Sequence, residues 1–473
     1  MRDMLILLNL DPSVARLTAR KLRSEKICCR ILPADTGRDA LIREDPCGLV
    51  LCAAMDTPIP ALDPFVFSGN IPLLALGSAA ALLNLRSGGT ASALSPGKKL
   101  CEIRCVQSPL FEKTAVFTHM ISGTLAVRVP EHFEVLATLG QECLPFAFSF
   151  PARHQFGTFL EPEPHDPDST KMLSRFAFSV CGCTPWWNED ALVGNSVASL
   201  RSLAGDGSAL CMMTGGLHAC VAAMLAGRAL GDRLTCCFVN TGLLQEGEEA
   251  RFTSFFRSTL RLNVVFLNEE KRFLEALKGL RSQEDKRSAI HSLMRVVARE
   301  VQRDIPNLSL VILDQAYTDA PRREPVSLRP GVQAAQPLAD LFLDEVRQVG
   351  AYLGLPYEMI AGQLIPDTGL ALNIVGEVTE ERLSILRFAD AVFRRKVRHS
   401  GQSLRLSEYY AVLRPYEKDT YSVILRALSS TYGDELRAAR TPYDVLEEAA
   451  EEIRSACPQV RRVLYDLTPS SRA

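Results

Sequence analysis

The first part of the chain alternates short apolar runs with amphipathic stretches. Four apolar runs predict strands, at residues 4–10, 27–32, 48–55 and 71–75. Residues 13–26 predict a helix, because Asp11-Pro12 and Ser13 form a typical helix start. Strands and helices that alternate at this spacing predict a parallel sheet covered by helices.

The pattern changes before residue 190. Residues 98–150 contain short β-type runs, residues 157–168 form a Pro-rich acidic loop, and residues 169–180 predict a helix behind Ser169. A short helical connector follows at 188–203. We therefore place a first domain boundary at about residue 190.

Strand and helix alternation resumes at Ser208 and gives way to an α+β pattern after residue 370. Before 370, the pattern predicts strands at 234–240, 263–267 and 309–313 and helices at 246–260 and 337–354. After 370, it predicts helices at 379–399 and 442–456 and strands at 410–413, 421–428 and 460–467. We predict an α/β protein with three domains, at residues 1–190, 191–369 and 370–473.

Composition narrows the classes of partner. The 473 residues carry 53 basic and 55 acidic side chains, so the net charge of −2 does not favour nucleic acid or an anionic membrane surface. The longest apolar stretch, 71–85, is too short to span a bilayer, and residues 4–10 are too short for a signal peptide. We expect a cytoplasmic protein.

Fourteen cysteines are spread along the chain, several of them within apolar runs. This distribution favours reduced, buried thiols. Cys181 and Cys183 form the one tight pair, but no second pair lies at the spacing of a zinc site, so we expect no metal centre.

Residues 208–244 have the pattern of a strand, a glycine turn, a helix and a second strand. The turn holds Gly215 and Gly216, and the helix follows directly. The first amides of a helix are unpaired and the helix dipole is positive there, so such a turn can bind an anion. We therefore consider the segment Thr214-Gly215-Gly216-Leu217-His218-Ala219-Cys220 a candidate phosphate site.

Extended segments of all three parts resemble one family. They include ARLTARKLRSEKICCRILPADT, LSRFAFSVCGCTPWW, GRALGDRLTCCFVNTGLLQEGE, ADLFLDEVRQVGAYLGLPYEMI, GLALNIVGEVTEERLSILRFADAVF and VRRVLYDLT. In this order they resemble glutamine-dependent GMP synthetase nearly end to end. The resemblance implies a class I glutamine amidotransferase-like domain at 1–190, an N-type ATP pyrophosphatase (PP-loop, adenine nucleotide alpha hydrolase-like) domain at 191–369 and a dimerisation domain at 370–473.

The resemblance also implies a reaction, in which XMP, ATP and glutamine give GMP, with ATP and Mg²⁺ as cofactors and a homodimer as the assembly. Glutamine hydrolysis in this family uses a cysteine nucleophile, a histidine base, an orienting glutamate and a glycine-rich oxyanion loop. In this chain Gly77 stands at the nucleophile position, Glu161 at the base position and Glu163 at the orienting position.

Two further residues bear on this chemistry. Ser78 is one residue late for the nucleophile, and the oxyanion loop is replaced by Cys52-Ala53-Ala54-Met55. We therefore expect no glutaminase activity. Cys52 as a substitute nucleophile is the alternative to a buried thiol, and the buried thiol is favoured.

The PP-loop of the family has the pattern Ser-Gly-Gly-Val-Asp-Ser-Ser. Thr214, Gly215 and Gly216 keep its first part, but His218 replaces the aspartate and Ala219 and Cys220 replace the two serines. Asn240 also stands where the family has aspartate. Mg²⁺ prefers oxygen ligands, and each lost hydrogen bond removes about 1 kcal/mol, so ATP and Mg²⁺ binding should be weakened. His218 either fills an unused loop or borders a residual anion site.

The positions implied for XMP are altered as well. The altered segments are Gly362–Ala371, Asn373, Val326–Arg329, Gln315-Ala316 and Tyr416–Thr420. A nucleotide dianion needs fixed cationic donors, and the basic segments are the ones reduced here. We predict a pseudoenzyme that binds a nucleotide or a protein partner. The alternative is an ammonia-dependent GMP synthetase or a related adenylating enzyme.

Overall fold

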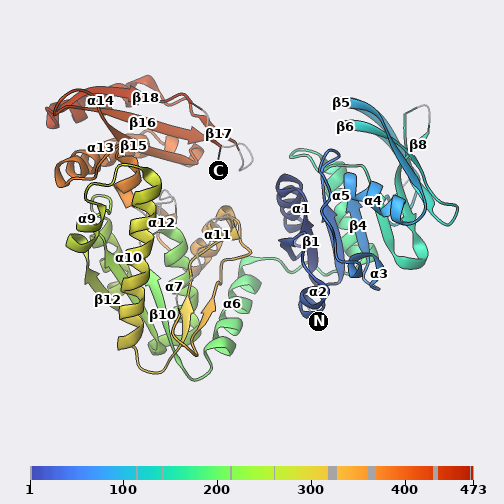
Figure 1. Ribbon diagram of the computed structural model, residues 1–473, viewed down its shortest axis with the longest axis horizontal. Coiled ribbons are helices and arrows are strands. Elements are labelled where there is room, and N and C mark those ends of the chain that lie inside the picture. The colour runs from blue at the N-terminus through green and yellow to red at the C-terminus, as the bar shows by residue number, and fades with distance from the viewer. Residues whose placement is uncertain are drawn as a thin grey trace. The chain divides into compact units, whose positions relative to one another are not determined.

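A computed structural model describes residues 3–112, 115–140, 143–213, 216–259, 262–317, 328–360, 369–429, 435–468 and 470–471. The chain divides into two compact units, Met1–Asn188 and Glu189–Ala473 (Figure 1). The finer division into three domains stays a prediction.

The first unit is built on a nine-stranded sheet with the order β2-β1-β3-β4-β9-β8-β7-β5-β6. Its strands are β1 (Leu5–Asn9), β2 (Cys29–Pro33), β3 (Gly48–Cys52), β4 (Leu73–Leu76), β5 (Thr90–Cys105), β6 (Ala115–Arg128), β7 (Glu134–Leu139), β8 (Leu144–Phe150) and β9 (Gln155–Thr158). The strands from β2 to β9 in this order are parallel, and the remaining four pair antiparallel.

The antiparallel half differs from the short runs predicted for residues 98–150. β5 has 16 residues and β6 has 14. β6 is one continuous strand, because its pairing with β5 continues on both sides of Gly123, although the register shifts between Ser95 and Lys98 of β5.

Helices flank the parallel half of this sheet (Figure 1). They are α1 (Pro12–Ser24), α2 (Arg38–Glu44), α3 (Phe65–Ser68), α4 (Ser78–Arg86) and α5 (Pro167–Arg175), with a π-helical turn η2 (Phe176–Val180). The Asp11 carboxylate accepts the amides of Ser13 and Val14 at 2.9 and 3.0 Å, which starts α1 as the sequence predicts. α1 packs on β1 and β2, and α4 packs on β4 and β9.

The second unit begins with a parallel sheet in the order β12-β11-β10-β13-β14. The strands are β10 (Ser208–Met213), β11 (Leu234–Asn240), β12 (Asn263–Asn268), β13 (Leu308–Ile312) and β14 (Gln333–Ala335). The helices are α6 (Glu189–Ala204), α7 (Leu217–Leu230), α8 (Glu248–Thr253), α9 (Glu270–Leu277), α10 (Gln283–Asp304), α11 (Leu343–Leu353) and α12 (Tyr357–Ile360). The helix predicted for 337–354 starts only at Leu343, because residues 336–341 form turns.

A second sheet follows in the same unit, with β15 (Glu408–Pro415), β16 (Tyr421–Ser429), β17 (Glu435–Ala438) and β19 (Ser470–Ser471) in order and β18 (Val460–Tyr465) paired with β16. Helices α13 (Glu380–His399) and α14 (Tyr443–Ala456) pack against β15 and β18. One apolar core continues from Val239 and Phe273 to Phe393 and Leu425, so both sheets share a core.

Two basic side chains reinforce this junction. Lys286 of α10 is fully buried and donates to the carbonyl oxygens of Ile374 and Ala371 at 2.6 and 3.4 Å. Arg387 of α13 donates to the carbonyl oxygens of Gly242 and Leu244 at 2.6 and 2.9 Å. The loop after β11 is therefore held by the helix that covers the second sheet.

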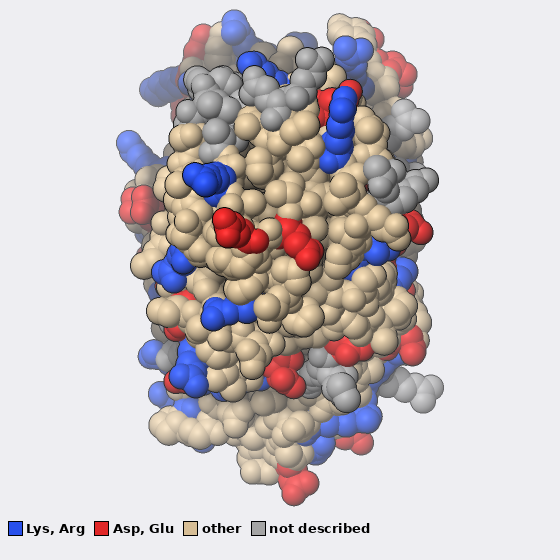
Figure 2. Space-filling model, turned by 90° about the vertical axis from the view of Figure 1, so that its right-hand side faces the viewer, with Lys and Arg blue, Asp and Glu red and all other residues tan. Residues whose placement is uncertain are grey.

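The surface of the first unit carries charges of both signs. Figure 2 shows them scattered over a mostly uncharged face, without a large single-sign patch on the described part of that view. Among the described residues, no helix is long and apolar enough to cross a membrane.

Candidate functional site

The first candidate site is the turn between β4 and α4. Gly77 lies in this turn with φ +56° and ψ −128°, a conformation that residues with a side chain rarely adopt. Its amide donates to the carbonyl oxygen of Thr158 in β9 at 3.0 Å. Gly77 therefore lies in a sharp turn between a strand and a helix, which we call the elbow.

The space above this elbow is occupied by the chain itself. A Cβ atom at Gly77 would lie 2.2 Å from the carbonyl oxygen of Ala53 and 2.9 Å from the carbonyl carbon of Ala54. These distances are far below van der Waals contact. A side chain at position 77, including a cysteine, would require the 53–54 segment to move.

The amides near the elbow also have partners. The Ser78 amide donates to the Ala54 carbonyl at 3.2 Å, and the Ser78 hydroxyl donates to the Thr57 carbonyl at 2.8 Å. The Ala54 amide donates to the Thr57 hydroxyl at 3.0 Å. An oxyanion hole needs amides directed at a substrate oxygen, and here these amides are directed at protein oxygens.

Glu161 contacts the same loop from the other side, since its carboxylate accepts the Met55 amide. The structure thus brings the nucleophile position Gly77 and the base position Glu161 to one loop, Ala53–Met55. In that loop the carboxylate serves as a hydrogen-bond acceptor for the backbone.

Glu163 lies near Lys21 of α1. Lys21 is 8% exposed and donates to the Asp166 carbonyl at 2.6 Å and to the Thr170 hydroxyl at 3.0 Å. Burial lowers the pKa of Lys21, although the carboxylates of Asp166 and Glu163 act in the opposite direction. Glu163 therefore lies near a cationic side chain, whereas the family resemblance implies a histidine that this glutamate would orient.

Cys52, the alternative nucleophile, is fully buried at the end of β3. Burial raises the pKa of its thiol well above the usual range. A protonated, enclosed thiol is a poor nucleophile, so the structure supports the buried-thiol interpretation.

The second candidate site is the turn between β10 and α7. Thr214 and Gly215 lie outside the described residues. Gly216 precedes α7 in an extended conformation, and its carbonyl accepts the Cys220 amide at 3.1 Å. The helix start predicted for this anion site is therefore formed at its described end.

The side chains of the first turn of α7 differ in exposure. Ala219 and Cys220 are buried at 0% and 1% exposure, and His218 is partly exposed. Burial raises the pKa of Cys220 well above its usual value, and the carboxylates of Glu248 and Asp314 raise it further. Position 220 thus presents a neutral thiol where the resemblance implies a serine hydroxyl.

Asn240 ends β11 and is engaged within its own loop. Its side-chain oxygen Oδ1 accepts the Gly242 amide at 2.8 Å, and its side-chain nitrogen Nδ2 donates to the Glu249 carboxylate at 3.1 Å. Glu248, only 1% exposed, accepts the Gln245 amide at 2.9 Å. These contacts fix the loop 240–249 by internal hydrogen bonds.

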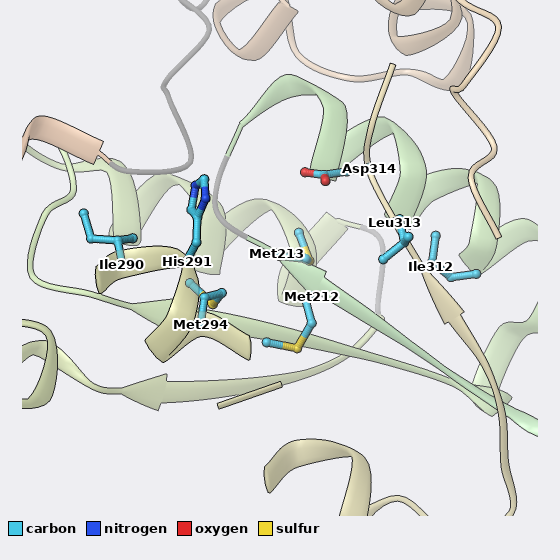
Figure 3. A pocket seen from close by; sticks show the side chains of 8 residues that line it. All are labelled: Met212, Met213, Ile290, His291, Met294, Ile312, Leu313 and Asp314. Carbon is cyan, nitrogen blue, oxygen red and sulfur yellow. The ribbon is translucent and has the colours of Figure 1, made fainter. Parts of the chain in front are cut away.

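A small cavity lies beside this second site, between β10, α10 and β13 (Figure 3). Its volume is about 160 Å³, and two of its lining side chains, His291 and Asp314, are polar. The others are apolar: Met212, Met213, Ile290, Met294, Ile312 and Leu313. Pockets for drug-sized ligands occupy roughly 300–1,000 Å³, so this cavity is smaller than such a pocket.

Asp314 and Glu248 are absent from the site residues predicted above. Asp314 directly follows β13, and the carboxyl ends of parallel strands meet at one edge of the sheet, where ligands bind. That rule would have identified Asp314. Glu248 carries no comparable sequence signal, because only its burial distinguishes it from the other acidic residues of the loop.

The predicted XMP-side positions are partly described. Arg329 donates to the Gln302 carbonyl at 2.6 Å, so its guanidinium caps the carboxyl end of α10. Gln315 accepts the Gln336 side-chain amide at 3.0 Å, and residues 416–420 form the turn between β15 and β16. Residues 326–327 and 361–368 lie outside the described part. Within that part, no group of three or more His, Cys, Asp or Glu side chains is placed to hold a metal ion.

Comparison with known proteins covers nearly the whole chain, although no family model matches it. The GMP synthase [glutamine-hydrolyzing] of Caldanaerobacter subterraneus subsp. tengcongensis is 31% identical over 99% of this chain and 97% of its own length. The enzyme of the same name from Caldicellulosiruptor saccharolyticus is 30% identical over 98% of each chain. That of Thermomicrobium roseum is 32% identical over 98% of this chain and 95% of its own. The chain therefore belongs to the GMP synthase family.

Proposed function

We propose that this chain is a GMP synthase-like protein without glutaminase activity that serves as a binding or regulatory protein. The observation that carries the proposal is the closed elbow at Gly77. The nucleophile position has no side chain, and the Ala53 carbonyl oxygen lies 2.2 Å from the place of a Cβ atom. Catalysis would require both a new nucleophile and a rearranged loop.

The electrostatics of the first site support the same proposal. The base position is a carboxylate that accepts the Met55 amide, and the Ser78 amide already donates to Ala54. A tetrahedral oxyanion would compete with the Ala54 carbonyl for the Ser78 amide and would lie near the Glu161 carboxylate. Each of these groups disfavours the negative charge that builds up on the substrate oxygen.

The second site supports weak nucleotide binding at most. The Cys220 thiol is buried beside two carboxylates, Glu248 and Asp314, which disfavour a phosphate group nearby. Asn240 is held by Gly242 and Glu249, so its side chain is used in the loop. We infer that ATP and Mg²⁺ bind more weakly here than the family resemblance implies.

Two assays on purified full-length protein test the proposal. With glutamine alone and with ATP, Mg²⁺ and XMP added, we expect no glutamate above the no-protein rate. A GMP synthase of about 31% identity, such as the Caldanaerobacter relative, serves as the positive control. Glutamate released at a rate that scales with protein concentration would contradict the loss of glutaminase activity.

The second candidate function is ammonia-dependent GMP formation. It is favoured by the strand β10, by the start of α7 behind Gly216 and by the cavity next to Asp314. Incubation with ATP, Mg²⁺, XMP and a high ammonium concentration distinguishes it. Pyrophosphate and GMP in equal amounts would establish this second function, and neither product is expected under the first.

Residual ligand binding is measured separately by thermal unfolding with ATP, AMP, XMP or GMP. A ligand at about 100 times its Kd stabilises a protein by about 2.7 kcal/mol. A shift with one nucleotide and none with inorganic phosphate would make that nucleotide the ligand. The absence of a shift with every nucleotide would leave a protein partner as the ligand.

We further propose a homodimer that forms through the C-terminal part of the chain. Leu464, Leu467 and Tyr443 in that part are 47%, 71% and 76% exposed, which supports an apolar contact surface. Light scattering should give about twice the chain mass of 52.1 kDa. A mass near 52.1 kDa across a concentration series would contradict the dimer.

A further inference from the structure

Two cysteines of the first unit meet near the amino-terminal ends of β1 and β3. The elbow lies at the other end of these parallel strands. Cys47 precedes β3, and its amide and thiol both donate to the Met4 carbonyl, at 3.0 and 3.2 Å. Cys183 follows η2, and its amide donates to the Ala177 carbonyl at 2.9 Å. The two sulfur atoms lie 3.0 Å apart, although the residues are 136 positions apart in the sequence.

A third thiol lies beside this pair. A Cβ atom built at Gly48 would lie 2.4 Å from the sulfur of Cys181, so Cys181 packs directly on the backbone next to Cys47. The glycine at position 48 leaves the space that this thiol occupies. Cys181 is therefore the natural competitor for any reaction of Cys47.

The thiols differ in acidity and access. The hydrogen bond from Cys183 lowers the pKa of Cys47, although burial and the Asp3 carboxylate act in the opposite direction. The contact with Cys47 and burial raise the pKa of Cys183, and burial raises that of Cys181. Cys47 is partly exposed and Cys183 is 6% exposed, so Cys47 is the more accessible and more acidic thiol of the pair.

We propose that Cys47 and Cys183 form a reversible intramolecular disulfide by exchange with a low-molecular-weight disulfide. Their sulfur atoms are already 3.0 Å apart, within about 1 Å of the ~2.05 Å bond. The backbone contacts with Met4 and Ala177 hold both residues in place.

The exchange has two balanced steps. The Cys47 thiolate attacks one sulfur of the small disulfide, whose S–S bond breaks and releases one thiolate. Cys183 then loses its proton to solvent and attacks the Cys47 sulfur of the mixed disulfide, which releases the second small thiolate. The protein loses two electrons, and the small disulfide gains them and becomes two thiols.

The bond would fix the segment that leads out of the first unit. The Trp186 and Trp187 amides donate to the Lys26 carbonyl at 2.9 and 2.8 Å, and the Trp186 indole donates to the Asp3 carbonyl at 3.2 Å. The first unit ends at Asn188. A disulfide at Cys183 adds a covalent tie to these hydrogen bonds and restricts the unfolded chain, so the oxidised protein should melt at a higher temperature.

The test equilibrates the full-length protein with glutathione at increasing ratios of oxidised to reduced form, followed by rapid alkylation and peptide mass spectrometry without reduction. We expect one cross-linked peptide pair, Cys47 with Cys183, and the loss of two of the 14 thiols. The oxidised protein should unfold at a higher temperature than the reduced protein. The addition of dithiothreitol should reverse both changes.

Matched variants separate the three thiols. Cys181→Ser should keep the cross-link and the thermal shift, whereas Cys47→Ser and Cys183→Ser should abolish both. Glutathione that remains on Cys47 while Cys183 stays a thiol would overturn the proposal. A cross-link between Cys47 and Cys181 that survives in Cys183→Ser, or no thiol loss at any ratio, would overturn it as well. The cross-link, the thiol loss and the thermal shift are also measured on the wild-type protein, so they test the proposal even if a variant folds poorly.

Discussion

Both units contain a strand, a glycine and a helix in this order, and under the proposed function the two sites have lost different parts. In the first unit β4 leads through Gly77 into α4, and in the second β10 leads through Gly216 into α7. Over Gly77, the carbonyl groups of Ala53 and Ala54 fill the space, and the Ala54 carbonyl accepts the Ser78 amide. Next to α7 there is a cavity lined by Asp314, while the Cys220 thiol is buried and the Asn240 side chain accepts the Gly242 amide.

Under the proposed function, this difference separates two ways in which a site loses its activity. Main-chain atoms of residues 53–54 block the first site. A single side-chain substitution does not move a main-chain segment that is held by several hydrogen bonds. Side-chain replacement weakens the second, and a side chain can be restored without moving the backbone. The following substitutions test that distinction, from the largest expected effect to the smallest.

Substitution of Gly77 by cysteine or alanine should destabilise the protein without creating glutaminase activity. The new Cβ would lie 2.2 Å from the Ala53 oxygen in a backbone with φ +56°. Strain and overpacking together should lower the free energy of unfolding by on the order of 3 kcal/mol. Urea unfolding measures this change.

Gly140→Ala is the matched control for this substitution. Gly140 lies in the same unit with φ +63°, and a Cβ there would meet nothing within 4 Å. Gly140→Ala should therefore show the backbone strain alone, roughly 1 kcal/mol. If Gly77→Ala and Gly140→Ala lowered the free energy of unfolding equally, the space above the elbow would be open. Glutamate production by Gly77→Cys would show that the first site is not blocked by the main chain.

Arg387→Ala should loosen the loop of the second site. The guanidinium donates to the carbonyls of Gly242 and Leu244, and hydrogen bonds from a charged group contribute about 1.5–3 kcal/mol. We expect a loss of about 2 kcal/mol and faster amide exchange in residues 241–247.

The control is Arg395→Ala, on the same helix. Arg395 pairs with Glu452 at the surface, with 44% and 37% of the two side chains exposed. Its loss should lower stability by less than about 0.5 kcal/mol. If Arg387→Ala were as mild as this control, the loop would be held by its own hydrogen bonds alone.

Combined reversal of the second site should restore some nucleotide binding. The variant carries His218→Asp, Ala219→Ser, Cys220→Ser and Asn240→Asp. It returns oxygen ligands to positions around an intact helix start, so Mg²⁺ and ATP should raise its melting temperature. With ATP at ten times its Kd the stabilisation would be about 1.4 kcal/mol.

Ala226→Ser provides the control for the second site, because Ala226 is also buried in α7 but far along the helix. It places a hydroxyl in the core and should give no response to ATP. If the combined variant also fails to respond, the backbone of the second site is closed, and the two sites differ less than proposed.

The smallest effect concerns two buried lysines, one in each unit. Burial lowers the pKa of Lys21 and of Lys286 below the usual 10.5, and Arg382 lowers that of Lys286 further. Between the lowered pKa and 10.5 the unfolded chain binds more protons, so the free energy of unfolding should rise with pH in that window.

Lys21→Met and Lys286→Met should each remove part of this rise. Urea unfolding at several pH values up to 10.5 measures the difference between each variant and the wild type. A difference that stays constant with pH would mean that the lysine pKa is the same in the folded and unfolded states.

Much of the fold follows from local pattern. The alternation of apolar and polar residues predicts β1, β3, β11 and α13 to within one or two residues, except that the predicted strand 48–55 ends at Cys52 in β3. Patterns of this kind are local, because a strand or a helix repeats over a few residues. The length of β6 was not predictable in this way, since its continuity depends on pairing with β5.

The sequence by itself also determined which residues stand at the positions of the two candidate sites: Gly77, Glu161, Ala219, Cys220 and Asn240 are identities that need no coordinates. Only the tertiary structure decided which groups surround these positions. The Ala53 oxygen over Gly77, the Arg387 contacts with the β11 loop and the Cys47–Cys183 pair all join residues 24 or more positions apart. Such contacts depend on how whole strands and helices pack. The periodicity of apolar and polar residues is local, so it does not show which distant residues lie close together.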